Sequence, residues 1–487
     1  MKKLRPIMIV GTGSDVGKSI INTGLCRIFL EDGHHPAPFK AQNMSLNSFA
    51  TPGGLEIGRA QAVQAEACGL SCSTDMNPVL LKPTGNMGSQ VIVNGRVRGN
   101  MSARDYFMDM ERDALFAEVL AAFHRLDQSY SPVVMEGAGS ISELNLRDRD
   151  ITNMRMAREA GAATYLVADI DRGGVFASVY GSLELLPQEE KKLIKGIIIN
   201  KFRGDPELFR EGKQMLEEIS GKPVVGILPF FMDIFIEQED SVVLDQMHGR
   251  IDPDRINVVV VRLQHMANFT DFDYLAMTEG VNVFFSTDPG TLMNADMLIL
   301  PGSKNTIADL KHLKDQGLDQ VIHKRFSMGK AVYGICGGYQ MMGREILDPL
   351  HVEGDREGIE GLGLLPVTTT LLAKKKTVQC SFTFRERQEI CYGYEIHMGE
   401  TLGESSEALC RIGKEVDGYF LNDRCWGTYI HGIFDNTAVL QEVLSPHGFG
   451  GNLQENFRDF KIRQYRKLAG LMRASLDMDY IYKSLEL

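Results

Sequence analysis

Cysteine, long hydrophobic runs and positive charge are all scarce in this sequence of 487 residues. Only 8 residues are cysteine and no two form a Cys-x-x-Cys pair, so the chain does not depend on a disulfide framework and a reducing compartment is expected. No apolar run approaches the ~18 residues that span a membrane. The apolar run 7–10 near the N-terminus is too short for a signal peptide. We therefore expect a cytoplasmic protein.

The charge balance narrows the range of partners. Lysine and arginine number 52 against 64 aspartates and glutamates, for a net charge of −12. An acidic chain has no general attraction for the phosphates of nucleic acids or membranes, so we expect neither as a partner. Small-molecule substrates remain. The sequence does not indicate an oligomeric state.

Two α/β halves make up most of the chain. In residues 1–236, short apolar runs alternate with helix-like stretches, which predicts a mostly parallel sheet with helices on both faces. The strands expected there are 7–10, 132–135, 164–168, 196–199 and 224–228. The polar residues 237–250 are expected to form a linker.

The second half repeats the α/β pattern. Residues 251–445 are predicted to be a second α/β domain, with shorter, antiparallel strands within 367–425. Its first expected strands are 256–261, 297–300 and 331–335. Residues 446–487 have the apolar spacing of helices and are expected to form a terminal helical tail.

A glycine-rich loop follows the first expected strand. The segment Gly11–Ser19 reads GTGSDVGKS and leads into a helix-like stretch. Glycines such as Gly13 and Gly17 let backbone N–H groups surround phosphate oxygens. Lys18 can pair with the β- and γ-phosphates, and the Ser19 hydroxyl can bind Mg²⁺. This pattern predicts an ATP site, and the alternative is a glycine-rich turn without a ligand.

The spacing of this loop is unusual, because five residues rather than four separate Gly11 from Gly17. In this respect it resembles the dethiobiotin synthetase-like branch of P-loop enzymes, which use ATP to activate a carboxylate as an acyl phosphate. The resemblance implies ATP and Mg²⁺ as cofactors and an adenine contact for Asn200. Glu136 ends an expected strand, where its carboxylate can hold Mg²⁺. Asp15 either assists the metal or the reacting carboxylate, or caps the loop.

A second group of residues suggests thiol chemistry. Cys336 stands in Gly-Ile-Cys-Gly-Gly between an expected strand and a helix, where a tight turn can present the thiol. His431 lies far downstream and can serve as the acid–base partner. Backbone N–H groups at Gly302 and Gly337 can form an oxyanion hole. The alternative for Cys336 alone is a buried structural cysteine.

This arrangement resembles a class I glutamine amidotransferase domain. The resemblance implies that Cys336 attacks the amide of glutamine and that His431 protonates the departing ammonia. The usual acidic third member is absent, because Ile433 stands two residues after His431. Asp435 is a candidate substitute at a different spacing, so the group that orients His431 is left open.

Four sequence blocks are distinctive together: FKAQNMSLNS (39–48), EIGRAQ (56–61), ADIDRGGVFA (168–177) and GYEIHMG (393–399). With them, nearly the whole chain resembles the cobyric acid synthase family. The resemblance implies amidation of the b, d, e and g carboxylates of adenosylcobyrinic acid a,c-diamide, with ATP and glutamine, on the route to cobalamin. The alternative within this class is cobyrinic acid a,c-diamide synthase. A nucleotide-switched partition ATPase or a non-catalytic binding module would leave Cys336 and His431 unexplained.

Residues of these blocks lie near expected strand ends, where α/β proteins bind ligands. We predict that five of them contact the polyanionic substrate, and solvated surface positions are the alternative: Lys40, Asn43, Arg59, Asp171 and Arg172. Glu56 is a candidate second metal ligand, or an ordinary glutamate at the start of a helix.

Overall fold

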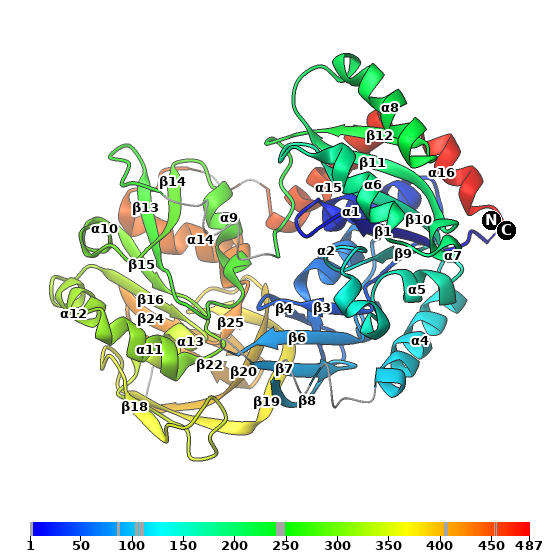
Figure 1. Ribbon diagram of the computed structural model, residues 1–487. Coiled ribbons are helices and arrows are strands. Elements are labelled where there is room, and N and C mark those ends of the chain that lie inside the picture. Colours follow the sequence, from blue (N-terminus) through cyan, green and yellow to red (C-terminus); the bar gives the residue numbers. More distant parts are fainter. Residues whose placement is uncertain are drawn as a thin grey trace.

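The computed structural model describes residues 3–84, 88–102, 106, 112–239, 249–403, 408–451, 453 and 455–487. Two α/β domains lie side by side (Figure 1), and the first carries the N-terminal half of the chain. The predicted fold class is therefore confirmed. Within the described residues, no helix is both long enough and apolar enough to cross a membrane.

A parallel sheet of six described strands forms the centre of the first domain, in the order β12-β11-β10-β1-β9-β2. Their bounds are β1 Ile7–Gly11, β2 Ala37–Phe39, β9 Val133–Glu136, β10 Ala163–Asp169, β11 Ile194–Phe202 and β12 Val224–Pro229. All five strands expected from the sequence are present. The three-residue strand β2 carries too short an apolar run to be recognised without its neighbours.

Helices cover both faces of this sheet, as the alternating side chains of β1 make clear. Ile7 and Ile9 are buried against α1, while Met8 and Val10 are buried on the opposite face with α4 and α6. The helices are α1 Lys18–Glu31, α2 Arg59–Ala67, α4 Arg112–Ser129, α5 Met154–Glu159, α6 Val175–Glu184, α7 Gln188–Lys191 and α8 Arg210–Ser220. Because both faces are covered, the strands are mostly apolar, with polar residues such as Glu136 and Asn200 toward their carboxyl ends.

The C-terminal tail returns to the first domain. Its helices α15 (Phe457–Ser475) and α16 (Met478–Leu485) lie beside α1 and β12, and the two chain ends meet (Figure 1). The N–H of Arg5 donates to the carbonyl of Leu485 at 2.9 Å. Gly24 lets α1 and α15 approach closely, because a Cβ there would lie 2.0 Å from the sulfur of Met472. The tail therefore completes the core of the first domain, a placement that the sequence did not indicate.

A small β region of the first domain faces the second domain. It holds a four-stranded sheet and a two-stranded hairpin. The strands are β3 Gln42–Met44, β4 Ser48–Ala50, β5 Glu56–Gly58, β6 Val79–Pro83, β7 Gly88–Val93 and β8 Arg96–Ser102. The hairpin β4–β5 docks on the other domain, where the Gln379 side chain donates to the carbonyl of Ala50 at 2.8 Å.

The second domain has its own six-stranded sheet, in the order β14-β13-β15-β16-β24-β23, in which only β23 is antiparallel among the described strands. The strands are β13 Ile256–Val261, β14 Val281–Ser286, β15 Met297–Leu300, β16 Ala331–Ile335, β23 Tyr419–Asn422 and β24 Cys425–Thr428. Its helices are α9 Asp273–Met277, α10 Pro289–Asn294, α11 Thr306–Asp315, α12 Leu318–Ser327, α13 Gly337–Met342 and α14 Thr437–Leu444. The three strands expected here are confirmed.

The region 367–425 corrects one expectation. Its strands are antiparallel, but the two main ones are long rather than short: β19 spans Val367–Phe384 and β20 spans Cys391–Gly403. The smaller strands are β17 Glu345–Leu347, β18 Gly358–Glu360, β21 Cys410–Ile412, β22 Glu415–Asp417 and β25 Ile430–His431. Polar residues interrupt the apolar pattern of β19 because much of it is solvent-exposed, so the strand reads as several short pieces.

Candidate functional site

Cys336 occupies a tight turn between β16 and α13. Its backbone has φ 51° and ψ −108°, a region that residues other than glycine rarely adopt. Residue 338 must be glycine for the chain to turn here, because it lies very close to β15. A Cβ at this position would lie 1.9 Å from the carbonyl oxygen of Leu300. The turn presents the thiol at the carboxyl end of the sheet, as the sequence pattern predicts.

His431 lies on β25 and is held by Asp271. Its Nδ1 is 2.7 Å from Oδ2 of Asp271, and the N–H of Gly432 donates to the other carboxylate oxygen at 2.9 Å. Burial favours neutral imidazole, but Asp271 and Cys336 outweigh it and raise the pKa of His431 to about 10. His431 is therefore held in the charged form beside the thiol.

Asp271 is the functional residue that the sequence reasoning missed. It belongs to the short 3₁₀ helix Phe269–Phe272 after β13, in no motif with Cys336 or His431, so no spacing could have identified it. Asp435, the candidate weighed from the sequence, makes no described hydrogen bond to His431. Asp435 instead lies next to Gly432: a Cβ on Gly432 would be 3.1 Å from Oδ2 of Asp435.

Both glycines predicted for the oxyanion hole lie at this site. A Cβ on Gly302 would be 3.2 Å from Cε1 of His431 and 3.8 Å from Cβ of Cys336. Gly337 begins α13, and a Cβ there would lie 2.7 Å from the backbone nitrogen of Ser303. The two loops therefore close around the thiol with backbone N–H groups nearby.

A cavity of about 50 Å³ opens beside Cys336 and His431. Its walls also contain a group of charged residues. These are Lys304, Glu353 and Lys375 of the second domain and Lys82 of the first. The thiol site therefore lies at the boundary between the domains, with residues of both in its walls.

The glycine-rich loop in the first domain has the geometry of a phosphate cradle. Gly17 has φ 99°, and a Cβ on Gly11 would lie within 3.0 Å of the Lys18 ammonium. That ammonium donates to the carbonyls of Gly13 and Gly139, both at 2.8 Å, so it lies over the loop at the start of α1. The glycines and the lysine at the start of α1 are thus in the positions expected of a phosphate-binding loop.

The oxygen atoms expected to hold Mg²⁺ lie together. The Ser19 hydroxyl donates to Oε1 of Glu136 at 2.8 Å. Lys40 contacts the same oxygen at 2.8 Å, and Gln64 donates to Oε2 at 2.7 Å. Although burial opposes ionisation, these partners lower the pKa of Glu136. One carboxylate and one hydroxyl suit Mg²⁺, which takes its other ligands from water and phosphate. The described residues contain no cluster of three or more His, Cys, Asp or Glu that could hold a metal.

Asn200 and Asp15 brace the loop in this structure. The Asn200 amide donates to the carbonyl of Val16 at 2.8 Å, and a Cβ on Gly17 would lie 2.1 Å from it. The backbone carbonyl of Asp15 accepts from Lys201 at 2.6 Å. These contacts fix the shape of the loop.

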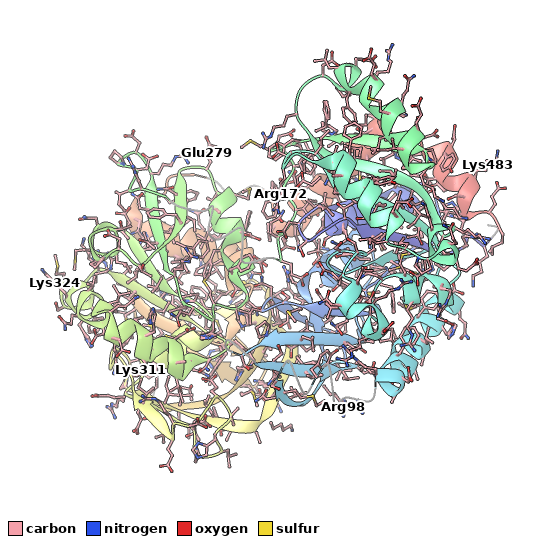
Figure 2. All side chains as sticks on the ribbon, viewed as in Figure 1. Arg98, Arg172, Glu279, Lys311, Lys324 and Lys483 are labelled. Carbon is pink, nitrogen blue, oxygen red and sulfur yellow. The ribbon has the colours of Figure 1, made fainter. Side chains whose placement is uncertain are left out.

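The five residues predicted to contact substrate fall into two groups. Lys40, Asn43 and Arg59 are buried between the nucleotide loop and the second domain. Asn43 donates to Gln61 and Glu239, and Arg59 pairs with Glu237. The others follow β10: Asp171 pairs with Arg203, and Arg172 lies 3.5 Å from Asp15, on the side facing the second domain (Figure 2).

Asn47 links the two sites. Its amide donates to the carbonyl of Glu239 at 2.8 Å, and its oxygen accepts from the N–H of Phe269 at 3.0 Å. Glu239 is the partner of Asn43, and Phe269 lies in the same 3₁₀ turn as Asp271. Hydrogen bonds therefore join the turn that carries Asp271 to Glu239 and Asn43, outside the amidotransferase half.

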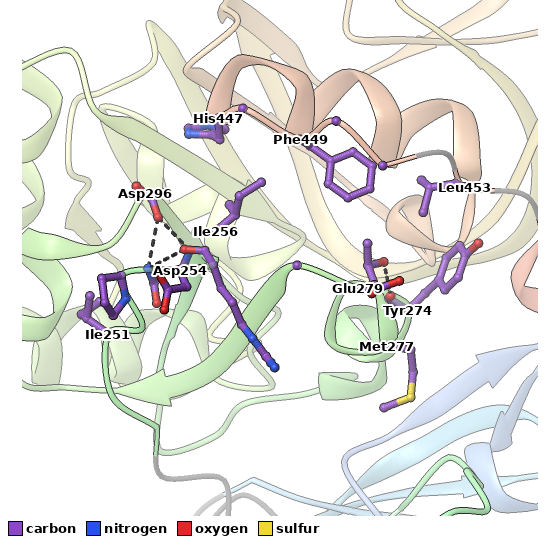
Figure 3. Close-up of a pocket in the computed structure, with 18 of the residues that line it drawn as sticks. Ile251, Asp254, Ile256, Tyr274, Met277, Glu279, Asp296, His447, Phe449 and Leu453 are labelled. Atoms are coloured by element: carbon purple, nitrogen blue, oxygen red, sulfur yellow. Dashed lines mark hydrogen bonds between the residues drawn. The ribbon is translucent and has the colours of Figure 1, made fainter.

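Glu56, the candidate second metal ligand, contacts Lys82 with one carboxylate oxygen and Lys375 with the other. Two larger cavities lie elsewhere. One of about 980 Å³ lies between the domains and is lined by Arg59, Tyr394 and Asp435 among others. The other, of about 920 Å³, lies by Tyr274, His447 and Phe449 (Figure 3), and neither Cys336 nor His431 lines it.

Comparison with known families agrees with both halves of this site. Residues 7–241 match the CobQ/CobB/MinD/ParA nucleotide binding domain, and residues 257–439 match the CobB/CobQ-like glutamine amidotransferase domain. Fold and site therefore define a two-domain, glutamine-dependent amide ligase.

Full-length relatives specify the family. The chain is 55% identical to cobyric acid synthase of Parabacteroides distasonis and covers 99% of each sequence. It is 45% identical to cobyric acid synthase of Caldanaerobacter subterraneus, over 99% of this chain and 98% of the relative. The chain belongs to the cobyric acid synthase family of cobalamin biosynthesis, which confirms the resemblance seen in the sequence.

Proposed function

We propose that this chain amidates the b, d, e and g carboxylates of adenosylcobyrinic acid a,c-diamide, using ATP and glutamine. The observation that carries the proposal is the presence, in one chain, of the Cys336–His431–Asp271 group and a phosphate loop, linked through Asn47. One site supplies ammonia and the other activates the carboxylate that receives it.

Glutamine hydrolysis is assigned to the thiol site. The Cys336 sulfur attacks the amide carbon, and N–H groups near Gly302 and Gly337 stabilise the oxyanion. His431, kept protonated by Asp271, gives its proton to the departing ammonia. Water then hydrolyses the thioester and releases glutamate.

Carboxylate activation is assigned to the nucleotide site. A substrate carboxylate oxygen attacks the γ-phosphorus of ATP and ADP leaves; ammonia then attacks the acyl carbon and phosphate leaves. Lys18 stabilises charge on the transferred phosphoryl group, and the loop glycines orient it. Ser19 and Glu136 would hold Mg²⁺, which disperses the phosphate charge when bound. We propose an adenine contact for Asn200, and contacts with the corrinoid for Lys40, Asn43, Arg59, Asp171 and Arg172.

Mass spectrometry tests the proposal directly. Adenosylcobyrinic acid a,c-diamide would be incubated with the protein, MgATP and glutamine, and each conversion of a carboxylate to an amide lowers the mass by ~1 Da, because OH is replaced by NH₂. Four successive steps are expected. No change there, with two steps on cobyrinic acid itself, would instead indicate the a,c-diamide synthase. ATP turnover independent of both glutamine and corrinoid would indicate a nucleotide switch.

A further inference from the structure

A buried ion cluster joins the two domains at the glutamine cavity. Glu56, at the start of β5, is 1% exposed and binds a lysine with each carboxylate oxygen. Lys82 of β6 lies 2.9 Å from Oε1, and Lys375 of β19 lies 2.5 Å from Oε2. The first two residues belong to the nucleotide-binding domain and the third to the amidotransferase domain.

An irregularity in β19 brings Lys375 to this position. Pairing with β20 passes from Leu371–Gly399 directly to Lys376–His397, so Lys375 is released from the regular ladder. Its ammonium also lies 3.5 Å from the side-chain oxygen of Gln90. The same strand docks on β4 through Gln379, so the position of Lys375 depends on contact between the domains.

The cluster leaves positive charge in the wall of the cavity. One carboxylate, Glu56, faces two ammonium groups, and Lys82 and Lys375 line the cavity together with Lys304 and Glu353. Burial lowers the pKa of Lys375 to about 8; Glu56 opposes this shift, and the neighbouring Lys82 and Lys304 add to it. An anionic group entering the cavity would stabilise both lysines.

We propose that Lys82 and Lys375 bind the α-carboxylate of glutamine and that Glu56 is a positioning residue that holds both ammonium groups. The proposal rests on the assignment of glutamine hydrolysis to Cys336. The thiol and both lysines line the same cavity, so a glutamine whose amide lies at Cys336 can present its α-carboxylate to the lysines. The nucleotide-binding domain thereby supplies a binding residue for glutamine.

The test compares hydrolysis of L-glutamine with that of L-glutaminamide, in which the α-carboxylate is replaced by a neutral carboxamide. In Lys82→Met and Lys375→Met, the KM for glutamine should rise about 10- to 100-fold, as expected for a lost charge-assisted hydrogen bond. The kcat and the KM for glutaminamide should remain near wild type. Lys82→Arg should restore much of the affinity, and Glu56→Gln should raise the KM for glutamine in the same direction.

Lys374→Met is the matched control, because Lys374 is exposed and next to Lys375 on the same strand. This variant should leave the KM and the kcat for both glutamine and glutaminamide unchanged. Parallel losses for glutamine and glutaminamide, or an unchanged KM for glutamine in both lysine variants, would overturn the proposal. Ammonia-dependent amidation, measured in each variant, identifies one that has failed to fold. If the assignment of glutamine hydrolysis to Cys336 were itself wrong, the Cys336→Ala variant would still release glutamate. This result distinguishes failure of the proposed function from failure of the proposal about the lysines.

Discussion

At the scale of single residues, Asp271 controls the protonation of His431. We expect Asp271→Asn to lower glutamate release about 10²- to 10⁴-fold, because the imidazolium loses its carboxylate partner. The raised pKa of His431, about 10, keeps it protonated below that pH, and the proton is lost as the pH rises through it. In the variant, this alkaline loss should begin nearer the ordinary pKa of ~6.5. Steady-state pH profiles of glutamine hydrolysis measure both effects.

Asp435→Asn is the control for that prediction, since Asp435 lies near Gly432 but has no described hydrogen bond to His431. Its pH profile and rate should match wild type. A profile shifted by Asp435→Asn and unchanged by Asp271→Asn would assign the orienting role to Asp435 instead.

A second residue-scale prediction concerns Lys18. Lys18→Ala should reduce amidation at least about 100-fold with either glutamine or ammonium as nitrogen source, because the phosphate site loses its cation. Glutamate release should persist, since Lys18 lies in the other site. The experiment quantifies amide product and glutamate in the same reaction, and full amidation by this variant would exclude the loop from catalysis.

The functional residues differ in how far local sequence identifies them. Cys336, His431 and Lys18 stand in motifs whose glycines are required by the local turn, so neighbouring residues were enough to predict them. Asp271 reaches His431 only because β13 and β25 are brought together by the tertiary fold, and its own sequence context contains no sign of this. The contact between Asp271 and His431 could therefore be identified only from the structure.

At the scale of elements, the β16–α13 turn requires glycine at 338. Gly338→Ala would place a Cβ 1.9 Å from the carbonyl of Leu300, and we expect a loss of stability of about 1–3 kcal/mol together with lower glutamate release. Gly470→Ala is the matched control, because that glycine is exposed within α15 and a Cβ meets nothing within 4 Å. It should stabilise the chain by about 0.5–1 kcal/mol. Calorimetric unfolding distinguishes the two, and equal stability of both variants would contradict this packing.

The helices and strands also differ in how well their sequence patterns predict them. Most parallel strands of both domains were predicted because burial on two faces requires continuous apolar residues, but β2 and β14 were not. The hairpin β19–β20 was predicted as shorter strands, because polar residues interrupt its apolar pattern, while backbone pairing with β20 resumes after the irregularity between Leu371 and Lys376. Pairing depends on a partner strand, which a single segment does not specify.

At the scale of the whole molecule, the terminal helices belong to the nucleotide-binding domain. Leu468 of α15 is fully buried in the core shared with α1 and β1, so Leu468→Ala should destabilise this domain by about 2–5 kcal/mol and weaken ATP binding. Leu487→Ala, at a site 65% exposed, should have little effect. Thermal unfolding with and without ATP measures this. A transition in which only the amidotransferase domain loses stability would contradict the assignment.

The central claim is that one chain makes ammonia at Cys336 and uses it at the phosphate loop. The most direct measurement is amide formation by Cys336→Ala with MgATP and corrinoid, supplied in parallel with glutamine or with ammonium chloride. We expect this variant to lose glutamine-dependent amidation and to retain ammonium-dependent amidation near the wild-type rate. Full glutamine-dependent activity in the variant, or loss of both activities in a folded protein, would contradict the account.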